Sequence, residues 1–308
     1  MEATYLFYGF ASEYVLHNIY KEMKKQGFNC LEIDALQIKN SKKIIDSLKD
    51  KRVIFITSAH LLLDKINFTD FYPNDNEFYS VLEIIKILRP IKKIYIPHDL
   101  TQPLIQYEET YLQFFDYFLS PCEPFTSIYS QYCKTEEVGW IKYQPDQNKT
   151  KKPTNRAIWL LSDYILHYKM GVEKSFNLIR PILEQGVAIK FPKWIGSDEF
   201  EKYYRKKGIN VYSASSNTIE LILDHQIIIT NGLSSTIAES YFLGKTVVNI
   251  MENSHYGNYL GYLQELFPNL LYFEKIKDFD IKKINKQNNP NILKPFDIEK
   301  TINLISFN

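Results

Sequence analysis

The stretch that decides the fold runs from Ile227 to Ile250 and reads Ile-Ile-Ile-Thr-Asn-Gly-Leu-Ser-Ser-Thr-Ile-Ala-Glu-Ser-Tyr-Phe-Leu-Gly-Lys-Thr-Val-Val-Asn-Ile. A β-branched apolar run leads through a polar, glycine-containing turn into an apolar helical segment, and a second apolar run follows Gly244. This order predicts strand, loop, helix and strand, which is the repeating unit of a parallel sheet.

The start of the predicted helix offers a place for an anion. Ser234, Ser235 and Thr236 stand where the first backbone amides of a helix lack partners and where the positive end of its dipole lies. Glu239 lies on the same helical face as Ser235, one turn later. Because a carboxylate repels phosphate, we expect Glu239 to accept hydrogen bonds from hydroxyl or amine groups of a ligand. An ordinary N-cap without any ligand is the alternative for this stretch.

The composition is that of a soluble globular protein with almost no net charge. The 308 residues suit two domains of roughly 150 residues each. Lys plus Arg number 37 against 36 Asp plus Glu, which argues against a global attraction to nucleic acid or to an acidic membrane. The three cysteines show no metal spacing and fit a reducing compartment. Without a secretion signal or an apolar run of about 20 residues, the sequence predicts a cytoplasmic protein. A peripheral contact with a membrane stays open.

Strand and helix patterns alternate along both halves of the chain. We predict an α/β fold with two Rossmann-like, doubly wound parallel sheets facing each other across a cleft. A polar, proline-bearing linker at 144–155 separates an N-terminal acceptor domain, 1–148, from a C-terminal nucleotide-donor domain, 149–308. The last helix is expected to pack back on the first domain. The main predicted strands cover 4–10, 29–33, 52–57, 93–97, 117–120, 136–143, 157–162, 187–192, 209–212 and the two in the opening stretch.

Ligands of such sheets bind beyond the carboxyl ends of the strands. In the first half, Gly9, Ser58 and His60 hold such positions, and the pair His98-Asp99 follows another strand. A histidine there can act as a general base, with its tautomer fixed by the aspartate or by a backbone group. Neighbouring residues of an extended chain point opposite ways, so helix capping is the alternative for one of the pair. The polar loop 64–76 is either an acceptor-binding loop or a plain surface excursion.

Three segments carry a resemblance to a known family. The run 234–248 resembles a pattern of bacterial capsule-polysaccharide transferases and polyglycerolphosphate (CDP-glycerol) transferases, which have the GT-B fold. The shared pattern is a Ser/Thr pair, a Glu one turn later, and Gly-Lys at 244–245, with Thr246 at the usual Pro position. The run 187–193 is similar to the family's strand that ends in a basic residue and His-Pro. Phe191 takes the His position there, between Lys190 and Lys193. The segments 116–121 and 138–142 resemble the end of the N-terminal domain in many GT-B enzymes.

The resemblance implies a metal-independent GT-B glycosyltransferase that needs no cofactor. It would move a sugar or related group from a nucleotide-activated donor to a hydroxyl acceptor, in surface glycan biosynthesis. The implied roles are His98 as base with Asp99 second; donor binding by Ser162, Asp163, Lys190, Lys193, Ser234, Ser235, Thr236 and Glu239; and acceptor binding by Gly9, Ser58 and His60.

Three alternatives to this function stay open. A DNA-modifying glycosyltransferase can share the fold, although the near-neutral charge counts against DNA as the acceptor. A sugar-nucleotide epimerase or hydrolase is the second alternative. The third is a binding module for nucleotide sugars that has lost activity, and Phe191 in place of the family's histidine favours it.

Overall fold

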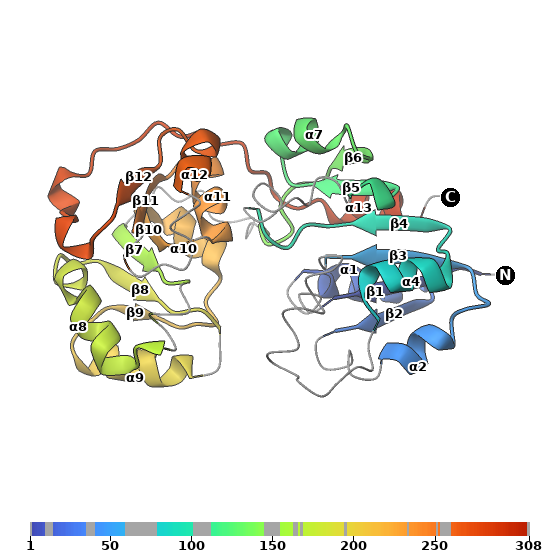
Figure 1. The fold of residues 1–308 in the computed structure, drawn as a ribbon, viewed down its shortest axis with the longest axis horizontal. Helices are drawn as coiled ribbons and strands as arrows, with labels where there is room; N and C mark the ends of the chain where they lie inside the picture. The colour runs from blue at the N-terminus through green and yellow to red at the C-terminus, as the bar shows by residue number, and fades with distance from the viewer. Residues whose placement is uncertain are drawn as a thin grey trace. The chain divides into compact units, whose positions relative to one another are not determined.

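The chain forms two compact units, each built around one sheet (Figure 1). Unit 1 comprises Met1–His98, Gln106–Gln144 and Lys294–Asn308, and unit 2 comprises Asp99–Ile105 and Pro145–Leu293. The computed structural model describes residues 2–9, 15–34, 41–58, 79–100, 112–144, 155–162, 166, 169–193, 196–232, 234–250, 252 and 260–306. The predictions for His60, Asp163 and the loop 64–76 therefore lie outside the described residues.

The sheet of unit 1 has six parallel strands in the order β2-β1-β3-β4-β5-β6. The strands are β1 (Thr4–Tyr8), β2 (Cys30–Ile33), β3 (Val53–Thr57), β4 (Lys92–Tyr95), β5 (Tyr117–Ser120) and β6 (Lys134–Glu137). The helices are α1 (His17–Lys25), α2 (Ser41–Asp46), α4 (Val81–Leu88), the 3₁₀ helix η2 (Leu112–Phe114), α7 (Glu123–Tyr129) and α13 (Ile298–Ser306).

The sheet of unit 2 also has six parallel strands, in the order β12-β11-β10-β7-β8-β9. The strands are β7 (Asn155–Leu160), β8 (Ala188–Lys190), β9 (Val211–Tyr212), β10 (His225–Asn231), β11 (Thr246–Ile250) and β12 (Leu271–Phe273). The helices are α8 (Val172–Leu183), α9 (Ser197–Lys206), α10 (Thr218–Asp224), α11 (Ser235–Phe242), α12 (Leu260–Leu266), and the 3₁₀ helices η5 (Ile276–Asp278) and η6 (Ile281–Lys283).

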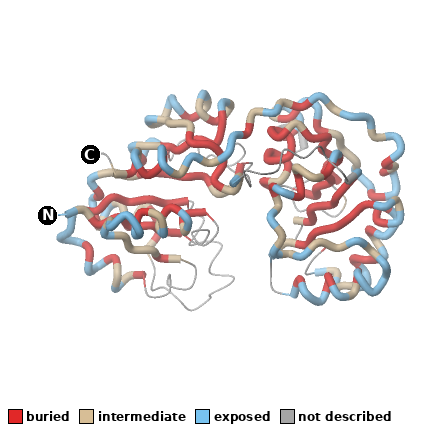
Figure 2. Tube along the Cα trace, turned by 180° about the vertical axis from the view of Figure 1, so that it is seen from behind, coloured by how far each residue is buried: buried red, intermediate tan, exposed pale blue. Residues whose placement is uncertain are grey.

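Burial explains why the central strands are apolar throughout. Every residue of β1, β3 and β11 is buried, as expected for parallel strands with helices on both faces. The central strands run as buried tubes in Figure 2, whereas helices such as α9 alternate between buried and exposed positions. The prediction of an α/β fold with two Rossmann-like parallel sheets is confirmed.

One predicted strand is wrong, because the chain leaves the sheet earlier than expected. We predicted a strand over 136–143, but β6 ends at Glu137. Gly139 has φ +81° and a Cβ there would lie 2.0 Å from the Pro295 carbonyl oxygen. Trp140 donates its backbone N–H to the Lys294 carbonyl at 2.9 Å. The segment after β6 therefore pairs with the stretch that leads into α13, within unit 1.

Candidate functional site

The strand order of unit 2 places a topological switch point between β7 and β10. β8 and β9 lie on one side of β7, and β10, β11 and β12 on the other. In open parallel sheets, ligands bind at the carboxyl ends of the two strands that flank such a point. Those ends are Asn231 of β10 and the residues that follow Leu160 of β7. Ser162, Lys190, Asn231 and the start of α11 all follow or close a strand at this edge, called here the carboxyl edge of unit 2.

Asn231 links the two strands and carries a donor without a partner. Its Oδ1 accepts from the Trp159 indole N–H at 3.2 Å and from the Ser162 amide at 3.0 Å, while the Ser162 hydroxyl donates to the Asn231 carbonyl at 2.9 Å. Both groups at Oδ1 are N–H donors, which fixes the orientation of the amide. Only 2% of Asn231 is exposed, and its Nδ2 has no partner among the described residues. A buried donor in that state needs an acceptor from a ligand or water.

The hydroxyls at the start of α11 supply one further donor. Ser234 is the N-cap; its Oγ accepts from the Thr236 amide at 3.3 Å and lies 2.8 Å from the Thr236 hydroxyl. Only one of the two hydroxyls can donate its proton to the other, so the second hydroxyl keeps a proton that it can donate to a ligand. Ser234 is therefore both the ordinary cap and half of a hydroxyl pair with one proton to offer.

Ser235 serves a different purpose from its two neighbours. Its hydroxyl donates to Glu239 Oε1 at 3.0 Å and accepts from the Leu100 amide at 3.3 Å. Leu100 is fully buried and belongs to unit 2, although it follows β4 in the chain. Since the hydroxyl proton of Ser235 already goes to Glu239, Ser235 has none left for a phosphate. Glu239 is 2% exposed, so its carboxylate is held inside the protein.

Lys190, the last residue of β8, places a buried ammonium group at the same edge. The residue is 8% exposed, and its one hydrogen bond within the described part of the chain is a long one, 3.4 Å from Nζ to the Phe191 carbonyl. Burial lowers the pKa of Lys190, and the negative charges of Glu201 and Glu239 partly offset this effect. A lysine has three N–H donors, so Lys190 can still donate to an anion.

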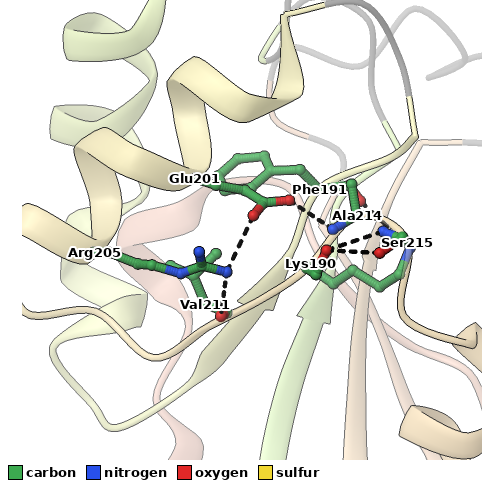
Figure 3. Close-up of polar contacts among 8 residues, drawn as sticks. Lys190, Phe191, Glu201, Arg205, Val211, Ala214 and Ser215 are labelled. Atoms are coloured by element: carbon green, nitrogen blue, oxygen red, sulfur yellow. Dashed lines mark hydrogen bonds and ion pairs between the residues drawn. The ribbon is translucent and has the colours of Figure 1, made fainter.

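Glu201 of α9 binds the loop after β9 (Figure 3). Its carboxylate accepts from the Ala214 amide at 2.6 Å and from Arg205 Nη2 at 3.0 Å. Arg205 also donates to the Val211 carbonyl at 3.1 Å. Glu201 is 7% exposed, so these bonds fix the loop from within the protein.

Phe191 and Lys193, from the same Lys-Phe-Pro-Lys segment, differ from Lys190 in their burial. Phe191 is fully buried, with its ring centroid 5.5 Å from that of Phe200 and 4.9 Å from that of Tyr204. It is part of the apolar core of unit 2, together with Trp159 and Ile229. Lys193 is exposed. Of the two lysines in the donor-site prediction, Lys190 is the one with a fixed, buried position at a strand end.

Unit 1 gathers three of its predicted residues at the switch point of its own sheet, between β1 and β3. Gly9 follows β1 with φ 149°, and Ser58 follows β3. His98 Nδ1 lies 2.7 Å from the Ser58 carbonyl oxygen. A carbonyl only accepts, so Nδ1 carries the proton and the basic lone pair of the neutral ring is on Nε2. Ser58 Oγ is buried without a partner in the described part of unit 1.

Asp99 does not fix the tautomer of His98. The backbone carbonyl of Ser58 does so, and Asp99 begins the segment that belongs to unit 2. Across the described ranges, no group of three or more His, Cys, Asp and Glu side chains could hold a metal ion. No helix within the described residues is long and apolar enough to span a bilayer.

Sequence reasoning missed three contributors to the carboxyl edge of unit 2. Asn231 had a readable signal, because an Asn-Gly pair directly follows a buried strand. Glu201 had none, since it looks like one more charge on a polar helix. Leu100 acts through its backbone amide across 135 residues of sequence, and no side-chain pattern reports such a contact.

The chain matches no protein-family model and no curated protein. Among solved structures, it is similar to a proposed UDP-N-acetylglucosamine 2-epimerase from Listeria monocytogenes, with 12% identity, coverage of 98% of this chain and 94% of that one, and a TM-score of 0.47. It is similar to the wall teichoic acid polymerase TagF, with 12% identity, coverage of 99% and 87%, and a TM-score of 0.45. MurG of Acinetobacter baumannii shows 9% identity, coverage of 99% of each chain and a TM-score of 0.39. These three proteins carry names of different activities, so the site is interpreted from its own residues.

Proposed function

We propose that the carboxyl edge of unit 2 binds the phosphate groups of a nucleotide-activated sugar, and that the protein transfers the sugar or a related group to a hydroxyl acceptor. The observation that supports this is a set of groups with donors to spare along the carboxyl edge of unit 2. They are the buried Nδ2 of Asn231, the ammonium of Lys190 and the spare proton of the Ser234–Thr236 pair. Buried donors without partners are rare, and together they match the acceptor oxygens of a phosphate.

The charges of the site favour binding through directed donors. Burial lowers the pKa of Lys190, and the negative charges of Glu201 and Glu239 offset only part of this effect. The phosphate would then be held by Lys190 as a point charge, by the neutral donors and by the positive end of the α11 dipole. Preorganised donors of this kind stabilise the charge that develops on a diphosphate leaving group during transfer.

His98 is the proposed general base in unit 1. Its tautomer places the basic lone pair on Nε2, as a base acting on a hydroxyl requires. Gly9 and Ser58, at the same switch point, are the proposed acceptor-binding residues. A glycan is the proposed acceptor in preference to DNA, because 37 basic and 36 acidic residues leave a net charge of only +1 to attract a polyanion.

Binding is tested by calorimetry with UDP, GDP, CDP and CMP on the wild type and on two lysine variants. Lys190→Met should weaken the preferred nucleotide by about tenfold or more, since one charge-assisted hydrogen bond contributes roughly 1.5–3 kcal/mol. Lys202→Met is the matched control, because Lys202 is an exposed lysine of α9. The donor-site proposal fails if no nucleotide binds, or if both variants bind as the wild type does.

Turnover is tested separately with the nucleotide sugar that the binding panel selects. His98→Ala should reduce transfer by about 100-fold or more while nucleotide affinity stays unchanged. Loss of affinity together with turnover would contradict the assignment of His98 as a base. Conversion of the donor without any acceptor would identify an epimerase or hydrolase instead, and binding without conversion would identify a binding module.

A further inference from the structure

A second cavity of unit 2 lies at the opposite, amino-terminal edge of its sheet. Its volume is about 570 Å³, and it is lined at the starts of three strands by Arg156 of β7, Gln226 of β10 and Thr246 of β11. Five residues of β10 separate Gln226 from Asn231, a distance of about 16 Å along a strand. The cavity is therefore distinct from the carboxyl edge, and its volume lies in the range of small-molecule sites.

The lining of this amino-edge cavity is cationic. Arg156, Lys245 and Lys286 contribute positive charges, and none of its lining residues in the described part of the chain is an aspartate or glutamate. Ile227, Leu243 and Ile284 supply an apolar wall. A cavity with three cations and one apolar wall suits an anion that carries a small organic part.

The cations keep donors to offer. Arg156 uses Nη2 to donate to the Ile281 carbonyl at 3.2 Å, and a guanidinium has five N–H donors. Lys245 Nζ donates to the Leu223 carbonyl at 2.8 Å and has two further protons. Lys245 is only 8% exposed, and Asp224, the acidic residue that acts on it, does not line the cavity. A buried lysine that lines a cavity is stabilised by an anion that reaches its ammonium group.

We propose that the amino-edge cavity is a second anion-binding site of unit 2, which takes a small phosphorylated or carboxylated organic molecule with two or more negative charges. The three cations come from separate parts of the chain, at the start of β7, just before β11 and after η6. A ligand with several anionic groups can pair with more of these three cations than a single phosphate does.

The test uses inorganic pyrophosphate as the probe and starts from the Lys190→Met variant, in which the carboxyl edge lacks its cation. In this background, calorimetry should show one remaining site. Adding Arg156→Gln and Lys286→Gln should weaken that site by at least tenfold. The matched control adds Lys202→Gln and Lys277→Gln, which remove two exposed charges of unit 2 outside the cavity, and its affinity should equal that of Lys190→Met alone.

Two outcomes overturn the proposal. One is the absence of pyrophosphate binding in Lys190→Met, and the other is equal affinity in the cavity variant and the control. A further variant, Lys190→Met with Lys245→Met, should also lose pyrophosphate binding at the remaining site. If circular dichroism shows that this buried substitution unfolds the chain, the variant with the two exposed residues changed decides the matter. Neither result depends on whether the carboxyl edge binds nucleotides.

Discussion

Replacing Phe191 by histidine tests whether this position belongs to the core or to the ligand site. The GT-B transferases that the sequence resembles carry a histidine here, so Phe191→His would restore the family's residue. In this protein the Phe191 ring is fully buried against Phe200 and Tyr204, with the Tyr204 ring nearly perpendicular at 84°. An imidazole placed there would lie in an apolar pocket, so we expect a loss of stability and no gain in nucleotide affinity.

The magnitude follows from two losses. A buried N–H left without a partner costs about 1–3 kcal/mol. The exchange also removes part of the hydrophobic contribution of a buried phenylalanine, which is about 1.5–3 kcal/mol in full, and weakens edge-to-face contacts worth about 0.5–1.5 kcal/mol each. These effects overlap, so we expect Phe191→His to lower the free energy of unfolding by about 2–4 kcal/mol.

Urea unfolding followed by circular dichroism and by the fluorescence of the buried Trp159 measures this loss. With a urea m-value of about 2 kcal/mol/M, in the middle of the usual range of about 1–3, the midpoint should fall by about 1–2 M. Phe191→Leu is the control, since it stays apolar and should cost less than about 1.5 kcal/mol. The reasoning is refuted if Phe191→His unfolds at the wild-type midpoint and binds nucleotide more tightly than the wild type.

Three shorter predictions concern other buried groups. Asn231→Asp keeps the oxygen that accepts from Trp159 and Ser162, so the fold should persist. The substitution replaces the unused donor with a negative charge, so calorimetry should show a nucleotide affinity at least about tenfold lower. Unchanged affinity would remove Asn231 from the site. Burial lowers the pKa of Lys245 to about 8, so between about pH 8 and 10.5 the unfolded chain binds more protons than the folded one. The free energy of unfolding of the wild type, relative to that of Lys245→Met, should therefore rise in this range by up to about 1.4 kcal/mol per pH unit. A flat or falling difference in urea unfolding would contradict it. Burial also raises the pKa of Cys30, Cys122 and Cys133 to between about 11 and about 12. Ellman's reagent at pH 7.5 should therefore react far more slowly with the native protein than with the urea-unfolded chain. Equal rates would show that the native protein has accessible thiolates.

The fold could be predicted because its central strands are buried on both faces. Such strands carry continuous apolar runs, as in Ile227 to Ile229 and Val53 to Ile56, and polar residues follow them. The prediction failed where that signal is weak. β12 is three residues long and half-buried, so Leu271 to Phe273 carries too little pattern. The segment after Glu137 is apolar, but its partner is a stretch more than 150 residues away, which no local pattern reveals.

The positions of the strand ends were also readable, because the alternation of strands and helices locates each end, and ligands of such sheets bind there. The direction of each side chain was not. Ser234, Ser235 and Thr236 look alike in the sequence, yet Ser235 is committed to Glu239 while the other two pair with each other. The difference depends on the Leu100 amide, which reaches the start of α11 only in the folded unit.

The two anion sites proposed for unit 2 differ in how positive charge is compensated, and this difference has a functional consequence. At the carboxyl edge, Glu201 and Glu239 partly offset the burial of the Lys190 ammonium group, so a bound phosphate meets directed donors and two nearby negative charges. Donors that are aligned in advance stabilise charge that appears during the reaction more than charge already present, which favours turnover over tight binding. In the amino-edge cavity, Arg156, Lys245 and Lys286 line a wall without carboxylates among its described residues. Excess positive charge favours retention of a polyanion, so this second site suits a ligand that stays bound, whereas the first suits a leaving group that must depart.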